Sequence, residues 1–183
     1  MPKPNRTLNA VLGFLTWHPM SGYDVQRRIE ESISNFWSES PGQIYPILRR
    51  LDDEGLAEKS SAASEGGRAR DVYTITERGR EELRRWLAET VVPAVPRNEL
   101  LLKLFFGRQV DREACIRLVR DYRKRMQELL EKYEATERRL RRDLAGHPDL
   151  AYWLITLRYG ERERRAVIDW ADETLAELEG RDP

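Results

Sequence analysis

"FWSESPGQIYPILRRLDDEGL", residues 36–56, carries the pattern that decides the fold of the amino-terminal half. Its aliphatic side chains recur at helical spacing and commit one face of a helix to a core. They are Ile44, Ile47, Leu48 and Leu51. The other face carries amide, aromatic and arginine side chains, namely Gln43, Tyr45, Pro46, Arg49 and Arg50. Such a face is either an ordinary solvated surface or a reader of base edges, for which Gln and Arg are best shaped. The neighbouring segments decide between the two.

Two helical patterns precede this segment. The first runs from Thr7 to Trp17, and the second runs from about Gly22 to Ile33, after the turn-forming stretch "HPMSG". We expect the third helix to begin between Gly42 and Gln43, because the first amide groups of a helix need no intrahelical partner and therefore tolerate the nearby prolines. Gly55 is expected to close that helix.

The periodicity changes after Gly55. "LAEKS" (56–60) and "DVYTIT" (71–76) have the character of short strands, and the segment between them, "SAASEGGRAR", is small, glycine-containing and basic. Thr76 then caps a fourth helix. Its predicted buried stripe consists of Leu83, Trp86 and Leu87. Three helices, a basic-tipped hairpin and a closing helix predict a winged helix-turn-helix domain over residues 1–90.

This plan predicts how the domain would hold DNA. The third helix would enter a major groove, and the hairpin tip would lie over a phosphate backbone. Gln43 would then pair with adenine and Arg49 with guanine, whereas Arg68 and Arg70 would contact phosphates. The predicted DNA-binding residues are Ser21, Tyr23, Ser38, Gln43, Tyr45, Pro46, Arg49, Arg50, Arg68 and Arg70.

"VVPAVPR", residues 91–97, has two prolines and is predicted to be a linker to a second domain, residues 98–183. "NELLLKLFFG" (98–107) is so apolar that it needs a core or a partner. A helix is then expected from Asp111 to about Leu144. Its apolar positions alternate in spacings of four and three, which is typical of a coiled-coil seam. They are Cys115, Val119, Tyr122, Met126, Leu129, Tyr133, Thr136 and Leu140.

A further long helix is expected from about Asp149 to Leu178, with its charged middle, "ERERR" (161–165), predicted to be a salt-bridged solvent face. The two long helices would form an antiparallel arm that pairs with a second copy. The residues assigned to dimerisation are Leu101, Leu104, Val119, Tyr122, Met126, Leu129, Tyr133, Leu140, Trp153 and Leu157. The predicted fold class is therefore mainly α, a winged helix-turn-helix domain followed by a long-helix dimerisation domain.

Composition narrows the function. The 183 residues hold 32 basic and 32 acidic side chains, which argues against holding nucleic acid by bulk charge, so any DNA contact must be local. One cysteine and two histidines predict no disulfide framework, no metal site and no cofactor. No apolar run is long enough to span a membrane and no signal core is present, which predicts a cytoplasmic protein with no membrane partner.

The chain resembles the PadR family of bacterial transcriptional regulators, in the subgroup with a long helical carboxy-terminal domain like that of the virulence activator branch. The resemblance rests on four blocks in the family's order. They are "SGYDVQRRIEESISNFWSESPGQIYPILRRLDDEGLAEK", "GRARDVYTITERGREELRRWL", "RNELLLKLFFG" and "YWLITLRYGERE". It implies a dimeric winged-helix repressor of double-stranded operator DNA, released in some members by a small-molecule effector.

Two other classes of function compete with this interpretation. An enzyme would need titratable groups gathered around a pocket, and the single cysteine and two distant histidines do not predict one. The alternative is a protein-interaction adaptor that uses the helical arm and no longer reads DNA. Such a protein would have little reason to keep the set formed by Gln43, Tyr45, Arg49, Arg68 and Arg70.

Overall fold

The computed structural model describes residues 6–34, 36–37, 39–62, 70–91, 93 and 97–180, with Pro41 and Ala62 described by their backbone alone. The chain divides into two compact units, Met1–Pro93 and Ala94–Pro183. The described part of the chain is mostly helical, with β1 and β2 paired in a small sheet. The mainly α fold predicted from the sequence is confirmed.

Three helices, α1 (Arg6–Leu15), α2 (Gly22–Ser32) and α3 (Pro41–Asp53), enclose the core of the first unit. The apolar side chains of α3 that the sequence assigned to a core are all buried: Ile44, Ile47, Leu48 and Leu51. The expected start of α3 is wrong, because the helix begins at Pro41 after the N-cap Ser40. Proline is suited to this first position, where its missing amide hydrogen is not needed and its fixed φ is already helical.

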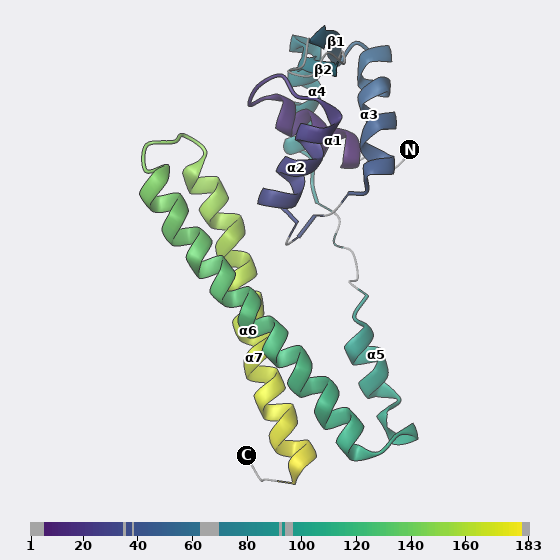
Figure 1. The fold of residues 1–183 in the computed structure, drawn as a ribbon, viewed down its shortest axis with the longest axis vertical. Coiled ribbons are helices and arrows are strands. Elements are labelled where there is room, and N and C mark those ends of the chain that lie inside the picture. Colours follow the sequence, from purple (N-terminus) through teal and green to yellow (C-terminus); the bar gives the residue numbers. More distant parts are fainter. Residues whose placement is uncertain are drawn as a thin grey trace. The chain divides into compact units, whose positions relative to one another are not determined.

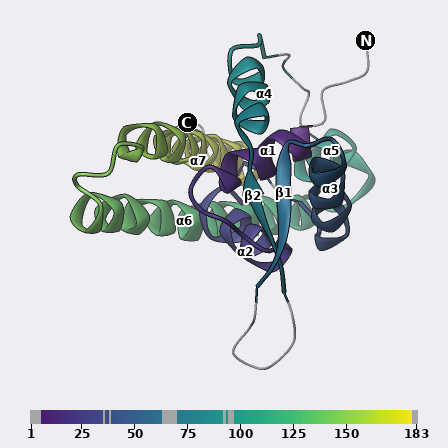
Figure 2. The same ribbon diagram turned by 90° about the horizontal axis from the view of Figure 1, so that it is seen from above.

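Strands β1 (Ala57–Ala62) and β2 (Arg70–Ile75) pair antiparallel, from Ala57 opposite Ile75 to Ala62 opposite Arg70. Gly55 adopts a positive φ of 68° after α3, which turns the chain into β1 as predicted. β1 lies beside α3 and β2 beside α1 (Figure 2). Met20, in the turn before α2, exchanges backbone hydrogen bonds of 3.0 and 2.9 Å with Tyr73. The hairpin is thus joined to the beginning of α2.

Helix α4 (Glu77–Leu87) closes the first unit. Thr76 caps it, because its Oγ1 accepts a hydrogen bond of 3.1 Å from the Gly79 amide. Leu83 is buried and Trp86 packs against the core, as predicted. Leu87 is 67% exposed, so its assignment to the buried stripe is wrong. As the last residue of α4, it lies beyond the part of the helix that covers the core.

The second unit contains α5 (Glu99–Phe105), a 3-10 turn η1 (Gly107–Gln109), α6 (Arg112–Asp143) and α7 (Leu150–Glu179). α6 and α7 run antiparallel and side by side (Figure 1). Their shared core contains Met126, Leu130 and Ile168. Cross-helix ion pairs flank it, and Arg123 Nε lies 2.5 Å from Asp172 Oδ1. The antiparallel pair predicted from the two apolar patterns is therefore formed within one chain.

The predicted seam of α6 is buried at Cys115, Val119, Met126 and Tyr133 and half-buried at its other four positions. Leu130 is buried at 5% exposure, whereas Leu129 only packs against the edge of the core. Burial at Met126, Leu130 and Tyr133 has spacings of four and then three, whereas the predicted pattern has three and then four at this point.

The charged segment "ERERR" of α7 is a salt-bridged solvent face for the most part, as expected, but Glu161 and Arg164 are half-buried. The side chain of Arg164 is only 14% exposed, and its guanidinium lies 6.0 Å from the centre of the Tyr133 ring. Gly160 explains this, because a Cβ there would come within 2.8 Å of Tyr133 Cε2. The missing side chain lets the ring of α6 approach α7 closely and places Glu161 and Arg164 beside it. Arg158, Arg162 and Arg165 remain exposed.

Candidate DNA-binding interface

The outer face of α3 carries the candidate reading residues. Gln43, Tyr45, Pro46, Arg49 and Arg50 are all exposed, while the aliphatic face of the same helix is buried. The division of this helix into a core face and an outer face therefore agrees with the sequence pattern. The roles of the individual side chains differ, however, because several of them already have partners within the chain.

Gln43 closes the amino end of its own helix. Its Oε1 accepts hydrogen bonds of 3.1 Å from the Ser40 backbone amide and 3.1 Å from the Ser40 hydroxyl. This is the second half of a capping box, in which the third helical residue reaches back to the N-cap. A bidentate contact with adenine needs both the oxygen and the nitrogen of the amide. Gln43 would have to release its oxygen from the cap to make that contact.

The two arginines of α3 differ in availability. Arg50 Nε donates a hydrogen bond of 2.6 Å to Glu54 Oε1, one turn further along the helix, so its charge is already paired. Arg49 has no hydrogen bond and no ion pair with any residue that the structure describes. Of the two, Arg49 is the guanidinium that is available to an external partner.

Tyr45 lies across the amino end of α2. A Cβ at Gly22 would stand 2.5 Å from Tyr45 Cε1, so this approach of the ring depends on glycine. The ring is nevertheless 47% exposed, and Tyr23, on the first turn of α2, is 59% exposed. The two tyrosines present hydroxyl and ring edges on neighbouring helices of the same unit.

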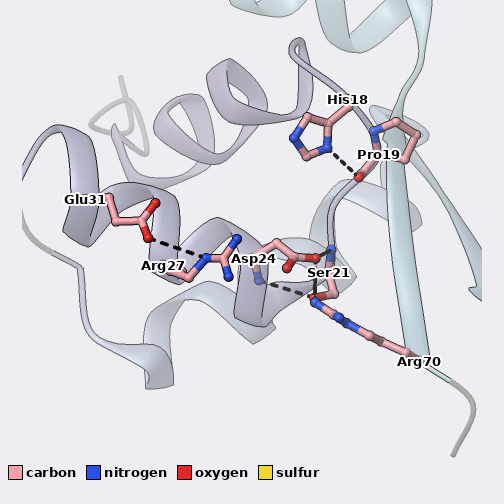
Figure 3. Close-up of polar contacts among 7 residues, drawn as sticks. All are labelled: His18, Pro19, Ser21, Asp24, Arg27, Glu31 and Arg70. Atoms are coloured by element: carbon pink, nitrogen blue, oxygen red, sulfur yellow. Dashed lines mark hydrogen bonds and ion pairs between the residues drawn. The ribbon is translucent and has the colours of Figure 1, made fainter. Parts of the chain in front are cut away.

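Ser21, Asp24 and Arg70 form a polar cluster at the amino end of α2 (Figure 3). Asp24 Oδ2 accepts hydrogen bonds from the Ser21 amide at 3.1 Å and from the Ser21 hydroxyl at 2.9 Å. Arg70 Nη2 lies 2.5 Å from the same oxygen and also donates to Ser21 Oγ. Burial raises the pKa of Asp24, but hydrogen bonds from Ser21 and Arg70 and the charge of Arg70 outweigh it and lower that pKa overall.

This cluster gives two of the predicted DNA-binding residues partners within the chain. Ser21 is only 3% exposed, and its hydroxyl caps α2 instead of presenting itself to DNA. Arg70 extends back to α2 rather than outward from the hairpin, so in this conformation it is not a free phosphate contact. Asp24 was missed, although the spacing of serine and aspartate in "SGYD" is a capping-box signal. Ser38 and Arg68 lie outside the described residues.

The residues assigned to dimerisation fall into two groups. Val119, Met126, Tyr133 and Leu157 are buried within the second unit of one chain, so their assignment to a contact between chains is corrected. These side chains are buried because α6 packs on α7 within one chain. The sequence pattern did not distinguish this internal contact from a contact between two chains. The others are half-buried or exposed and keep accessible surface: Leu101, Leu104, Tyr122, Leu129, Leu140 and Trp153.

Exposed apolar side chains lie on this second unit, including two phenylalanines in the segment "NELLLKLFFG" that was expected to need a core or a partner. Phe105 is 82% exposed and Phe106 is 58% exposed at the end of α5. Tyr152, Ile155 and Tyr159 of α7 are 70%, 61% and 67% exposed. The three side chains of α7 were not predicted to form an exposed surface. Their spacing of three and four residues, which places them on one side of the helix, was the signal in the sequence.

Both halves of the chain match known families. Residues 11–85 match the family described as transcriptional regulator PadR-like, and residues 96–179 match the one described as virulence activator alpha C-term. The chain belongs to the PadR-like family of transcriptional regulators. This family assignment confirms the resemblance found in the sequence, including the subgroup.

Relatives of this PadR-like chain extend over nearly its full length. The negative transcriptional regulator PadR of Bacillus subtilis is 29% identical over 175 residues, which cover 93% of this chain and 96% of the relative. The structure of that protein in complex with operator DNA is similar with a TM-score of 0.83, at 27% identity, 93% coverage of this chain and 98% of the other. The Vibrio cholerae virulence activator AphA has a TM-score of 0.74 at 26% identity, covering 96% and 99%.

The described residues were also compared with the requirements of a metal site and of a membrane-spanning helix. The described part of this PadR-like chain contains no cluster of three or more His, Cys, Asp or Glu side chains that could hold a metal ion. Among its helices, none combines the length and the apolar character needed to cross a membrane.

Proposed function

We propose that this PadR-like protein acts in the cytoplasm as a homodimeric repressor, which binds a palindromic operator with α3 of each protomer in a major groove. The observation that carries the proposal is Arg49, an exposed guanidinium on the outer face of α3 that has no hydrogen bond and no ion pair with a described residue. Arginine paired with the O6 and N7 atoms of guanine is the commonest specific contact in a major groove. The Bacillus subtilis PadR complex with operator DNA supports the use of this fold on DNA.

The charge of the first unit requires two copies. Up to Val92, acidic residues outnumber basic ones by one, so the unit has no bulk positive charge to attract DNA. Affinity must come from a few placed side chains, and a twofold dimer doubles them on a palindromic site. The centres of the half-sites are then expected to lie about one helical turn of DNA apart, or a multiple of it.

The reading role of Arg49 is tested by Arg49→Ala. We expect operator affinity to fall by roughly 1–3 kcal/mol and base preference to relax at one position of each half-site. Arg84→Ala is the matched control, because it removes an exposed arginine from α4 of the same unit. Equal operator affinity of the Arg49→Ala variant and the wild type would refute the assignment, and would favour the adaptor function.

The dimer is proposed to form through the exposed apolar side chains of α5 and α7. Phe105, Phe106 and Tyr152 leave large apolar surfaces uncovered within one chain, and such surfaces mark interaction sites. Sedimentation of the wild type is expected to show a dimer at micromolar concentration, and Phe105→Glu is expected to shift it toward monomer. Leu87→Glu is the control, since it places a charge on an exposed leucine of α4. A wild-type monomer would contradict the proposal.

We further propose that a small-molecule effector weakens operator binding. The support is the structure of Bacillus subtilis PadR in complex with p-coumaric acid, which has a TM-score of 0.76 with this chain. That acid is therefore the first compound to add to the wild-type protein and its operator. Release of DNA would identify phenolic acids as effectors. Unchanged binding would exclude this compound and call for a wider screen.

A further inference from the structure

The amino end of α2 holds a carboxylate where a helix would ordinarily attract an anion. Free amide groups and the helix dipole make such ends favourable sites for phosphate. Here Asp24 Oδ2 occupies the position, with the Ser21 amide at 3.1 Å, the Ser21 hydroxyl at 2.9 Å and Arg70 Nη2 at 2.5 Å. A DNA phosphate that approached this end of α2 would meet a negative charge already bound there.

Arg70 is held in this arrangement by its strand as well as by its charge. It is the first residue of β2, and three residues further on Tyr73 is hydrogen-bonded to Met20, just before α2. The guanidinium also lies 5.8 Å from the centre of the Tyr23 ring. The side chain remains 42% exposed, so solvent and ligands reach it. Arg70 is therefore fixed against α2 but not buried.

This pairing removes one positive charge from the part of the domain that would face DNA. A cation contributes to sequence-independent binding when it neutralises a phosphate and releases a counterion. Arg70 neutralises Asp24 instead, and the pair as a whole adds no net charge. Asp24 thereby lowers the attraction of the domain for any DNA. Arg49 on α3 is unaffected, because it bonds to neither residue within the part of the chain that the structure describes.

We propose that Asp24 is a positioning residue that holds Arg70 on α2 and limits the protein's affinity for DNA phosphate, so that operator and non-operator DNA are better distinguished. The inference rests on the proposed DNA-binding function. In this proposal Asp24 weakens DNA binding, because its ion pair with Arg70 must be exchanged for a pair between Arg70 and a phosphate.

The direct test is Asp24→Asn, which keeps an oxygen that can accept from Ser21 but removes the negative charge. The probes are a random-sequence duplex and a duplex that the wild type enriches from a random pool. We expect the variant to bind the random duplex about threefold to tenfold more tightly, with a salt dependence steeper by about 0.9 for each additional phosphate that it neutralises. Affinity for the enriched duplex should rise less, so the ratio of the two affinities falls.

A second variant shows whether Asp24 acts through Arg70. In an Arg70→Ala background, Asp24→Asn should raise affinity for the random duplex less than in the wild type, because no guanidinium is left to release. Thr76→Ala is the structural control, since it removes a similar helix cap at α4, away from this cluster. It should lower thermal stability without changing the salt dependence.

The possible failures are distinguishable. If the wild type enriches no duplex and binds no random DNA, both the proposed function and this inference are wrong. If the wild type enriches a duplex but Asp24→Asn leaves random binding and its salt dependence unchanged, only the role of Asp24 is refuted. Weaker binding to both duplexes in equal proportion, with a loss of stability like that of Thr76→Ala, would show that Asp24 is only a helix cap.

Discussion

Gln43 and Arg49 lie on the same exposed face of α3, yet the structure gives them different tasks. The oxygen of Gln43 is hydrogen-bonded to Ser40 and helps to begin the helix. Arg49 makes no such contact among the described residues. If Gln43 contacts DNA as proposed, a substitution there changes both the stability of α3 and that contact, and the two effects need separate variants.

Gln43→Glu separates these effects. Glutamate serves in a capping box as well as glutamine does, so thermal unfolding should stay close to that of the wild type. Operator binding should nevertheless be lost, because a carboxylate then faces the bases and phosphates of the groove. Gln43→Ala should instead cost about 1 kcal/mol of stability or less and weaken binding more mildly. A Gln43→Glu protein that binds the operator like the wild type would show that this position does not face DNA.

Gly22 allows the ring of Tyr45 to lie close to the amino end of α2. In Gly22→Ala the new Cβ would stand 2.5 Å from Tyr45 Cε1, so the ring must move. Because the ring is 47% exposed, it can swing outward, and we expect a cost of about 1 kcal/mol rather than unfolding. In a Tyr45→Ala background the same substitution should cost less, as a double-mutant cycle of thermal unfolding would show. Additive effects would mean that the two side chains do not interact.

The sequence predicted which residues of α3 face the core but not which of them have partners. The burial of Ile44 and Leu48 follows from spacing along one helix, which is a local property. The contact of Arg70 with Asp24 joins residues far apart in the chain, and the Met20–Tyr73 bridge that ties β2 to the turn before α2 brings them together. No local pattern carries that information.

The α6–α7 pair shows which features of a helix pair the sequence pattern does not predict. The antiparallel pair itself followed from two long apolar patterns separated by a proline and a glycine. The partial burial of Glu161 and Arg164 could not be predicted from these patterns, because it depends on the close approach of Tyr133 to Gly160. Charge alone predicted a solvent face, and packing between the helices overrode it at these two residues only.

Glu161 provides a pH prediction for this pair. Its burial, followed by the nearby charge of Glu137, raises the pKa of its carboxyl above the ordinary value of 4.5, while the charge of Arg165 opposes the shift. A raised folded-state pKa contributes stability that is present below the unfolded pKa and is lost as pH rises through the folded one. Near neutral pH the charged form of Glu161 therefore destabilises the helix pair.

Glu161→Gln is accordingly expected to raise the melting temperature at pH 7, with a smaller difference near pH 4, where the wild-type carboxyl is protonated. Glu137 has a lowered pKa, chiefly through its hydrogen bond from Arg141, and its contribution is lost as pH falls. Comparison of variant and wild type at each pH largely cancels that effect. Glu128→Gln, at an exposed position of α6, is the control. A lower melting temperature for Glu161→Gln at pH 7 would contradict this account.

Each unit of the chain has a feature that a single copy does not explain. The first unit has the exposed candidate reading residues of α3 but no excess of positive charge. The second unit has exposed phenylalanine and tyrosine side chains that the described part of the chain does not cover. A twofold dimer answers both, because it covers the apolar surfaces and doubles the DNA contacts. The resulting site on DNA must then share the symmetry of the protein.

Selection of duplexes from a random-sequence pool by the purified wild-type protein shows whether two copies of the chain bind DNA symmetrically. We expect enrichment of an inverted repeat bound by two chains, with half-site centres about one helical turn of DNA apart or a multiple of it. The same selection with Arg49→Ala is expected to lose the preference for one base pair in each half-site. Enrichment of no sequence, or of an asymmetric site bound by a single chain, would contradict the account.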